Sequence, residues 1–167
     1  MLPISKIAAI LSAQTDKPRS TIERTLRNWV ATGRLQPTRR IPRGQYVEAQ
    51  FDAVGVCQAR LMMAIASMMP VGFDVTTFDA ATDHAVSEEI GNLNPVTGQT
   101  TTYSLAAAIA GTRKGEEWFF SVAMSHDLFP SGHWHKGSLK ALDLSEIEAV
   151  AIIPFSRQCR PILAGLA

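Results

Sequence analysis

The first third of the chain has apolar residues at helical spacing. Between Pro3 and Ala13 they recur at every third or fourth position, which predicts a first helix with one buried face. The same period returns between Ser20 and Leu35 and predicts a second helix. The apolar stripe of this second helix consists of Ile22, Leu26, Trp29 and Val30.

Both ends of the second helix are marked in the sequence. Ser20 and Glu23 have the spacing of a capping box, and Gly33 suits a left-handed stop. Between the two helices, the turn formers Asp16 and Pro18 let the second helix leave in a new direction. The two helices therefore form a helix-turn-helix pattern.

A polar face lies opposite the apolar stripe of the second helix. Its arginine, asparagine and hydroxyl side chains are hydrogen-bond donors of the kind that reach DNA phosphates and the edges of guanine or adenine. We therefore expect a DNA-recognition helix. Its candidate DNA-binding residues are Arg19, Ser20, Thr21, Arg24, Arg27 and Asn28.

The segment from Leu35 to Tyr46 is expected to be a short hairpin or an irregular wing. Pro37 and Pro42 argue against a helix, and Gly44 favours a tight bend. A basic wing beside a basic helix can straddle a groove, with the helix in the major groove and the wing against the flanking backbone or the minor groove. The candidate DNA-binding residues at its exposed tip are Arg39, Arg40 and Arg43.

A longer third helix is predicted over Glu48–Met69. Its second half, residues 61–69, is apolar nearly all round, which indicates burial against a C-terminal domain or against a second copy of the chain. A homodimer is therefore expected. Residues 70–74 have the pattern of a boundary, so the predicted domains are 1–69 and 70–167.

The C-terminal part has patterns of a small mixed domain with an antiparallel sheet. Stretches rich in β-branched and aromatic residues indicate strands, and clusters of Gly, Pro and Asn indicate turns. The expected fold class is α+β, a winged helix-turn-helix followed by this mixed domain. The expected elements are an acidic helix over residues 83–93, a turn over 94–98, a strand over 100–105 followed by more strand or by a short helix at 106–111, a turn over 112–115, strands over 116–125 and 148–155, and a helical turn with Ser145 and Glu148 as its capping box.

Charge separates the two parts of the chain. Residues 1–60 hold ten Lys or Arg and four Asp or Glu, whereas residues 61–167 hold six Lys or Arg and eleven Asp or Glu. A basic module in a near-neutral chain indicates that the N-terminal part meets a polyanion. The first apolar run is too short and too polar for a secretory signal or a membrane span, so a cytoplasmic protein without membrane contact is expected.

One family resemblance adds to this interpretation. The run TLRNWVATGRLQPTRR, with the Gly-containing turn, Tyr46 and the helix that follow it, resembles the N-terminal winged helix of the mercury-resistance-regulator (MerR) and excisionase-like proteins. The resemblance covers about residues 4–69 and implies a DNA-binding role for Arg24, Arg27, Asn28 and the wing arginines. The positions that match the family pattern are Thr25, Leu26, Arg27, Trp29, Gly33, Leu35 and Pro37.

A histidine-rich stretch is a second candidate site. Imidazoles and a carboxylate close together are ligand types that suit zinc. However, Pro130, Gly132 and Gly137 indicate a flexible loop that is solvated or contacts a partner. Trp134 within it is a candidate exposed anchor for a protein partner, and no metal or cofactor is expected. The candidate ligands are His126, Asp127, His133 and His135.

The remaining reactive groups have plain structural interpretations. Cys57 and Cys159 are expected to be buried thiols, and redox sensing is the open alternative because Arg160 adjoins Cys159. The adjacent acids at 88–89 and 116–117 point apart on a helix or strand and cannot share a substrate. The chain is therefore not expected to be an enzyme.

Three hypotheses of function follow. The first is a sequence-specific transcription regulator that binds double-stranded DNA, with a C-terminal domain that dimerises, binds a protein partner or senses a small molecule. The second is a protein-interaction adaptor of a phage or mobile-element regulatory circuit that does not bind DNA itself. The third is a metal-dependent hydrolase that uses the histidine-rich stretch. The first accounts best for a basic N-terminal part that combines an Arg-Asn helix with an arginine-bearing wing.

Overall fold

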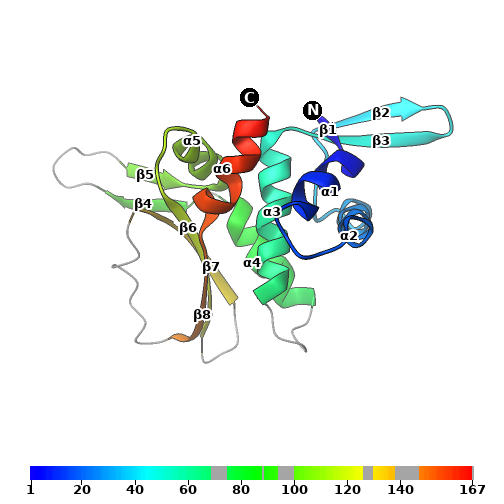
Figure 1. Cartoon of the computed structure of the whole chain (residues 1–167). Helices are drawn as coiled ribbons and strands as arrows, with labels where there is room; N and C mark the ends of the chain where they lie inside the picture. Colours follow the sequence, from blue (N-terminus) through cyan, green and yellow to red (C-terminus); the bar gives the residue numbers. More distant parts are fainter. Residues whose placement is uncertain (69–74, 88, 94–99, 126–129, 138–146, 167) are drawn as a thin grey trace. The chain divides into compact units, whose positions relative to one another are not determined.

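The structure, a computed structural model of the chain, combines helices with antiparallel sheets (Figure 1). The described residues form six helices and three antiparallel sheets, which places the chain in the α+β class. No helix in this part of the chain is long and apolar enough to cross a membrane. The residues that the structure describes are 1–68, 75–87, 89–93, 100–125, 130–137 and 147–166.

The chain divides into two compact units. The first comprises Met1–Arg60 and Ile162–Ala167, and the second comprises Leu61–Pro161. The long helix α3, Ala53–Met68, therefore contributes its first half to one unit and its second half to the other. The domain boundary expected at residues 70–74 lies outside the described residues.

Two helices open the first unit. α1 spans Ile4–Ser12 and α2 spans Arg19–Ala31, so both predicted helices are confirmed. The expected capping box is wrong, because α2 begins at Arg19 with Pro18 as its N-cap and without a side-chain cap. The proline ring holds φ at −57°, so the turn into the helix is complete before Ser20 is reached. Glu23 pairs with Arg27 instead.

A three-stranded antiparallel sheet completes the first unit. Its strand order is β1 (Leu2–Pro3), β3 (Tyr46–Phe51) and β2 (Arg39–Arg43), so the hairpin expected after α2 is present. The two strands of the hairpin join at Gly44. Its φ is +63°, a value that glycine adopts without strain. Gly33 has a φ of +79° just after α2, as its position in the sequence predicted.

The third helix begins later than the sequence indicated. Glu48 belongs to β3, where the buried residues Ala49 and Phe51 alternate with half-buried ones, so the predicted helix is wrong at its start. The side chain of Asp52 accepts a hydrogen bond from the Gly55 amide at 2.9 Å, which caps the first turn of α3. The most deeply buried side chains of the first unit include Ile7, Leu11, Ile22, Leu26, Leu35, Phe51 and Cys57.

The second unit has more strand than helix. In chain order its elements after α3 are α4 (Val75–Val86), β4 (Glu89–Leu93), β5 (Thr100–Tyr103), α5 (Leu105–Arg113), β6 (Trp118–Ser125), β7 (Pro130–Lys136), β8 (Ile147–Ile153) and α6 (Phe155–Gly165). β4 pairs with β5, and β6 is the central strand of the sheet β7–β6–β8. The three strands predicted here are confirmed as β5, β6 and β8, and residues 106–111 take the helical alternative.

One predicted helix and one predicted turn of the second unit are wrong. The acidic helix expected over residues 83–93 ends at Val86, and the chain then forms β4. The ladder partner of β4 is the later strand β5, which a local pattern does not reveal. The turn expected over 112–115 is shorter, because α5 continues to Arg113.

The histidine-rich stretch is a strand where the structure describes it. His133 and His135 lie on β7, which pairs with β6. Pro130 is the first residue of this edge strand, a position that tolerates its missing N–H. A Cβ on Gly132 would come within 2.5 Å of Phe120 Cζ, so glycine here permits close packing rather than a loop. The features outside the described residues are His126, Asp127, the turn at 94–98 and Ser145. The helical turn expected at Glu148 is wrong, because this residue belongs to β8.

Trp134 lies at the centre of an aromatic core. Its side chain is 3% exposed, and its indole N–H donates to the Ala85 carbonyl at 3.0 Å. Its ring centroid lies 4.9 Å from those of Phe120 and Phe155. The expectation of an exposed anchor is therefore wrong, because the Trp134 side of β7 faces this core.

A polar cluster lies beside this aromatic core. Lys136 Nζ donates to Glu116 Oε1 at 2.8 Å, and the Trp118 indole N–H donates to Glu116 Oε2 at 3.1 Å. These hydrogen bonds, first that from Lys136 and then that from Trp118, hold the pKa of Glu116 below its ordinary value of 4.5. The cluster therefore favours the ionised carboxylate.

The lowered pKa of Glu116 predicts how stability depends on pH. The stabilising contribution of this carboxylate is present above its unfolded pKa of 4.5 and is lost as the pH falls through its native pKa. Replacing Glu116 by glutamine should lower stability slightly at neutral pH and flatten the acid limb of the stability curve. Urea midpoints measured from neutral to acidic pH would show this. Lys136→Gln should flatten the same limb, and an unchanged slope in both variants would contradict the assignment.

Candidate functional site

α2 presents a polar face to solvent on the side away from its buried stripe. Ile22, Leu26 and Trp29 point inward and are at most 6% exposed. The division of the helix into two faces therefore follows its predicted period. Of the candidate DNA-binding residues on α2, Thr21 is half-buried and the exposed ones are Arg19, Ser20, Arg24, Arg27 and Asn28.

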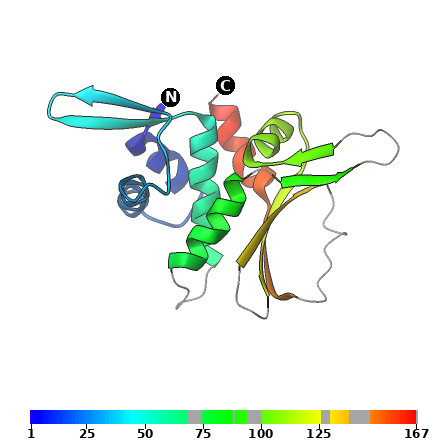
Figure 2. The ribbon, with the colours of Figure 1, turned by 180° about the vertical axis from the view of Figure 1, so that it is seen from behind.

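The hairpin β2–β3 extends away from α1 and α2, and the two opposite views agree on this (Figure 1 and Figure 2). Its arginines at 39, 40 and 43 are all exposed, but they do not share one face. Arg40 lies opposite Ala49, on the face that is buried further along β3. Arg43 lies opposite Tyr46 on the other face, and alternation places Arg39 with Arg43. The expected cluster of three arginines is thus divided between two sides of the hairpin.

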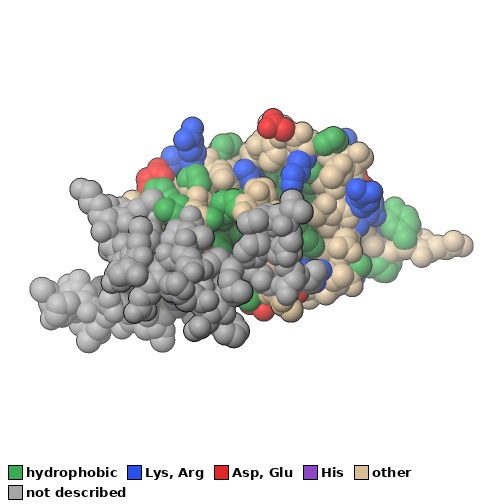
Figure 3. Space-filling model, turned by 90° about the horizontal axis from the view of Figure 1, so that it is seen from below, with side chains coloured by type: hydrophobic (Ala, Val, Ile, Leu, Met, Phe, Trp, Pro, Cys, Tyr) green, Lys and Arg blue, Asp and Glu red, His purple; other side chains and the backbone are tan. Residues whose placement is uncertain are grey.

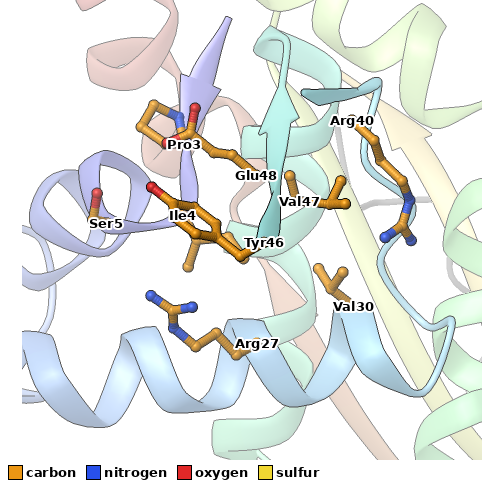
Figure 4. A pocket seen from close by; sticks show the side chains of 10 residues that line it. Pro3, Ile4, Ser5, Arg27, Val30, Arg40, Tyr46, Val47 and Glu48 are labelled. Atoms are coloured by element: carbon orange, nitrogen blue, oxygen red, sulfur yellow. The ribbon is translucent and has the colours of Figure 1, made fainter. Parts of the chain in front are cut away.

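A cleft of about 430 Å³ lies between α2, the hairpin and the start of α1. Figure 4 shows Arg27 reaching toward Tyr46 at one end of this cleft and Arg40 at the other end, with Val30 and Val47 between them. The cleft thus joins the basic face of α2 to the hairpin, where Arg40 is the wing arginine that lines it. The rest of its lining consists of Pro3, Ile4, Ser5, Glu48 and Ala49.

Two carboxylates accompany the arginines near this cleft. Glu23 Oε1 accepts a hydrogen bond from Arg27 Nη2 at 2.7 Å, and the arginine side chain remains 66% exposed. Glu48 Oε2 lies 3.6 Å from Arg43 Nη2 and accepts a hydrogen bond from Gln50. Exposed pairs one helical turn apart contribute only about 0.3–0.5 kcal/mol. A phosphate can therefore replace Glu23 as the partner of Arg27 at little cost.

Sequence reasoning missed the exposed apolar side chains of the hairpin. Tyr46 is 63% exposed and Val47 is 57% exposed. Figure 3 shows hydrophobic and basic side chains next to each other where the hairpin projects at the right. Alternation in YVEAQF places Tyr46 opposite the face of Ala49 and Phe51, but it would group Val47 with those buried residues. The exposure of Val47 therefore has no signal in the local pattern.

The second unit brings fewer of the predicted groups together. Ser121 Oγ lies 2.8 Å from His135 Nε2 across β6 and β7. In the described ranges, no three potential metal ligands form a group. Cys57 and Cys159 are both buried, as expected for structural thiols. The candidate functional site is therefore the exposed polar and basic surface of the first unit.

None of the protein-family models, curated proteins or solved structures compared with the chain matches it. The interpretation of the site therefore rests on its own geometry. That geometry consists of an exposed polar helix face, a projecting hairpin that carries arginines, and the cleft between them.

Proposed function

We propose that the chain is a sequence-specific DNA-binding transcription regulator. Its first unit acts as a winged helix-turn-helix, with α2 in the major groove and the hairpin β2–β3 as the wing on the flanking backbone or in the minor groove. The observation that carries the proposal is the exposed polar face of α2 beside an arginine-bearing hairpin, in the part of the chain that holds most of its positive charge. The resemblance to the MerR and excisionase-like winged helices supports the same role.

The size and the exposed face of α2 fit a recognition helix. Its 13 residues span roughly 20 Å, and the major groove of B-DNA, about 12 Å wide, admits an α-helix. Arg24 and Asn28 are one turn apart on the exposed face, so they can reach neighbouring base pairs. Arginine pairs with guanine through two hydrogen bonds and asparagine pairs with adenine in the same way. In this proposal Arg24 and Asn28 read bases.

The second unit dimerises, binds a protein partner or senses a small molecule in this proposal. Residues 61–167 hold six Lys or Arg and eleven Asp or Glu, so DNA repels this part of the chain. A homodimer places two recognition helices on half-sites separated by about one helical turn of DNA. A cytoplasmic location is part of the proposal.

Removal of a base-reading side chain should relax sequence preference. Asn28→Ala is expected to reduce the discrimination between a selected duplex and a random duplex by about 1–3 kcal/mol, because its paired hydrogen bonds to a base are lost. The selected duplex comes from a random library enriched with the full chain. Kd values for both duplexes, at low and at near-physiological salt, measure the effect and its salt dependence.

Gln36 supplies a matched control, because its amide is exposed beyond the end of α2 and has no base-reading role in this proposal. Gln36→Ala should leave the discrimination unchanged. Equal losses on the selected and random duplexes for Asn28→Ala would refute its base-reading role. If no duplex binds and an acidic protein surface does, the adaptor hypothesis replaces this one.

A further inference from the structure

We infer that the cleft between α2 and the hairpin receives the sugar–phosphate backbone of one DNA strand. Arg27 and Arg40 hold two different phosphates of that strand, and Val30 and Val47 contact the sugar between them (Figure 4). This inference rests on the proposed function. It assigns Arg27 to the backbone, whereas Arg24 and Asn28 are the proposed base readers.

The chemistry of the cleft matches a backbone segment. Its volume of about 430 Å³ falls in the range of roughly 300–1,000 Å³ that is typical of pockets for small molecules. Guanidinium groups bind phosphate oxygens through paired, charge-assisted hydrogen bonds. The two valines offer apolar surface between the cations, and a deoxyribose ring offers carbon-bound hydrogens to it. Along the cleft, the order of arginine, valines and arginine therefore matches the order of phosphate, sugar and phosphate along a DNA strand.

The helix period separates Arg27 from the other polar residues of α2. Arg27 and Val30 are three positions apart and line the cleft together. Arg24 and Asn28 lie on the exposed face without being part of the cleft lining. Arg27 therefore stands at the edge of the recognition face that is nearest the hairpin, where the backbone passes when α2 occupies the groove.

The hairpin register selects Arg40 among the three wing arginines. Arg40 lines the cleft, and it shares the face of Ala49. Arg43 lies on the opposite face and is 3.6 Å from Glu48. Arg113, an exposed arginine in the last turn of α5, has no DNA-binding role in the proposal and therefore provides a control of the same charge.

The Arg27–Glu23 pair does not prevent this use of Arg27. The pair is exposed to solvent, and the arginine side chain is 66% exposed. A bound phosphate can take over one edge of the guanidinium while Glu23 returns to water. Glu48 also lines the cleft, but Gln50 and Arg43 already hold its carboxylate. The charged residues of the lining are two arginines and one glutamate, so their formal sum is positive, which favours an anion.

The test combines neutralised phosphates with arginine variants of the full chain. Single methylphosphonates, which remove one backbone charge, are placed in turn along each strand of the selected duplex. Within each half-site, we expect two positions on the same strand to depend on Arg27 and Arg40. Arg27→Gln should become insensitive to one of these positions and Arg40→Gln to the other, whereas Arg113→Gln should keep both sensitivities.

Affinity gives a second readout on the same variants. Arg27→Gln and Arg40→Gln should each weaken the selected and the random duplex equally, by about fivefold at near-physiological salt, and lower the salt slope by about 0.9. Arg113→Gln should change both affinities less than about twofold. A loss confined to the selected duplex for Arg27→Gln would overturn the inference. Placement of the Arg27-dependent and Arg40-dependent positions on opposite strands of one half-site would also overturn it. Absence of duplex binding by the wild-type chain would instead refute the proposed function itself.

Discussion

Phe120→Ala is expected to lower the free energy of unfolding by about 3–5 kcal/mol. Phe120 is 0% exposed and lies on the central strand β6, opposite Trp134 on one side and Ile153 on the other. Its ring centroid is 4.9 Å from that of Trp134. β6 is paired with a strand on each side, which limits how far the surrounding side chains can move into the cavity that the variant leaves. Urea unfolding, with the slope and midpoint both determined, measures the loss.

Phe119 provides the matched control for this prediction. It is the neighbouring phenylalanine on β6, it is half-buried, and alternation places it on the opposite face of the sheet. Phe119→Ala should cost less than half as much, because part of its ring is already in water. Equal losses for the two variants would show that the aromatic core is not centred on the Phe120 face.

Leu26→Ala is expected to lower the free energy of unfolding by about 2–5 kcal/mol. Leu26 is 0% exposed and lies on the inner side of α2, beneath the proposed recognition face. The variant should bind duplex normally at temperatures where it is fully folded and should lose binding at a lower temperature than the wild type. Chemical unfolding and duplex binding, measured over the same temperature range, separate these two effects.

Arg24 is the control for Leu26, because it belongs to the same helix and its side chain is exposed. Arg24→Ala should change stability by no more than about 0.5 kcal/mol and should weaken binding of the selected duplex. Leu26→Ala is therefore expected to lose stability and keep DNA binding, whereas Arg24→Ala is expected to keep stability and lose DNA affinity. If Arg24→Ala destabilises the chain as much as Leu26→Ala does, the polar face of α2 has a structural role and the proposed function loses its support.

The elements that could be predicted from the sequence are those set by residues close together along the chain. The period of the sequence predicts Leu26 and Trp29 inside α2 and Arg24 outside, because an amphipathic helix repeats its environment at each turn. Gly33 and Gly44 marked the ends of segments, because few other residues adopt a positive φ without strain. The helices and the hairpin of the first unit could therefore be read from short windows of sequence.

The elements that the sequence did not reveal depend on pairing partners that are distant along the chain. β4 exists because β5 offers it a ladder, and β7 is a strand because it pairs with β6 despite Pro130 and Gly132. The cleft also could not be foreseen. Its two arginines come from α2 and β2, and only the pairing of the hairpin decides that Arg40 rather than Arg39 shares its side with Ala49.

The short turn at Gly44 has a consequence for how such a surface can change. Strand residues alternate between the two faces of the hairpin. A change of one residue in the length of the turn therefore moves each side chain of β2 to the other face. Gaining or losing one turn residue while β3 stays anchored by Phe51 would bring an odd-numbered side chain, such as Arg39 or Ile41, to the place of Arg40. A single inserted or deleted codon could thus exchange a cation for an aliphatic group without any substitution in the strands.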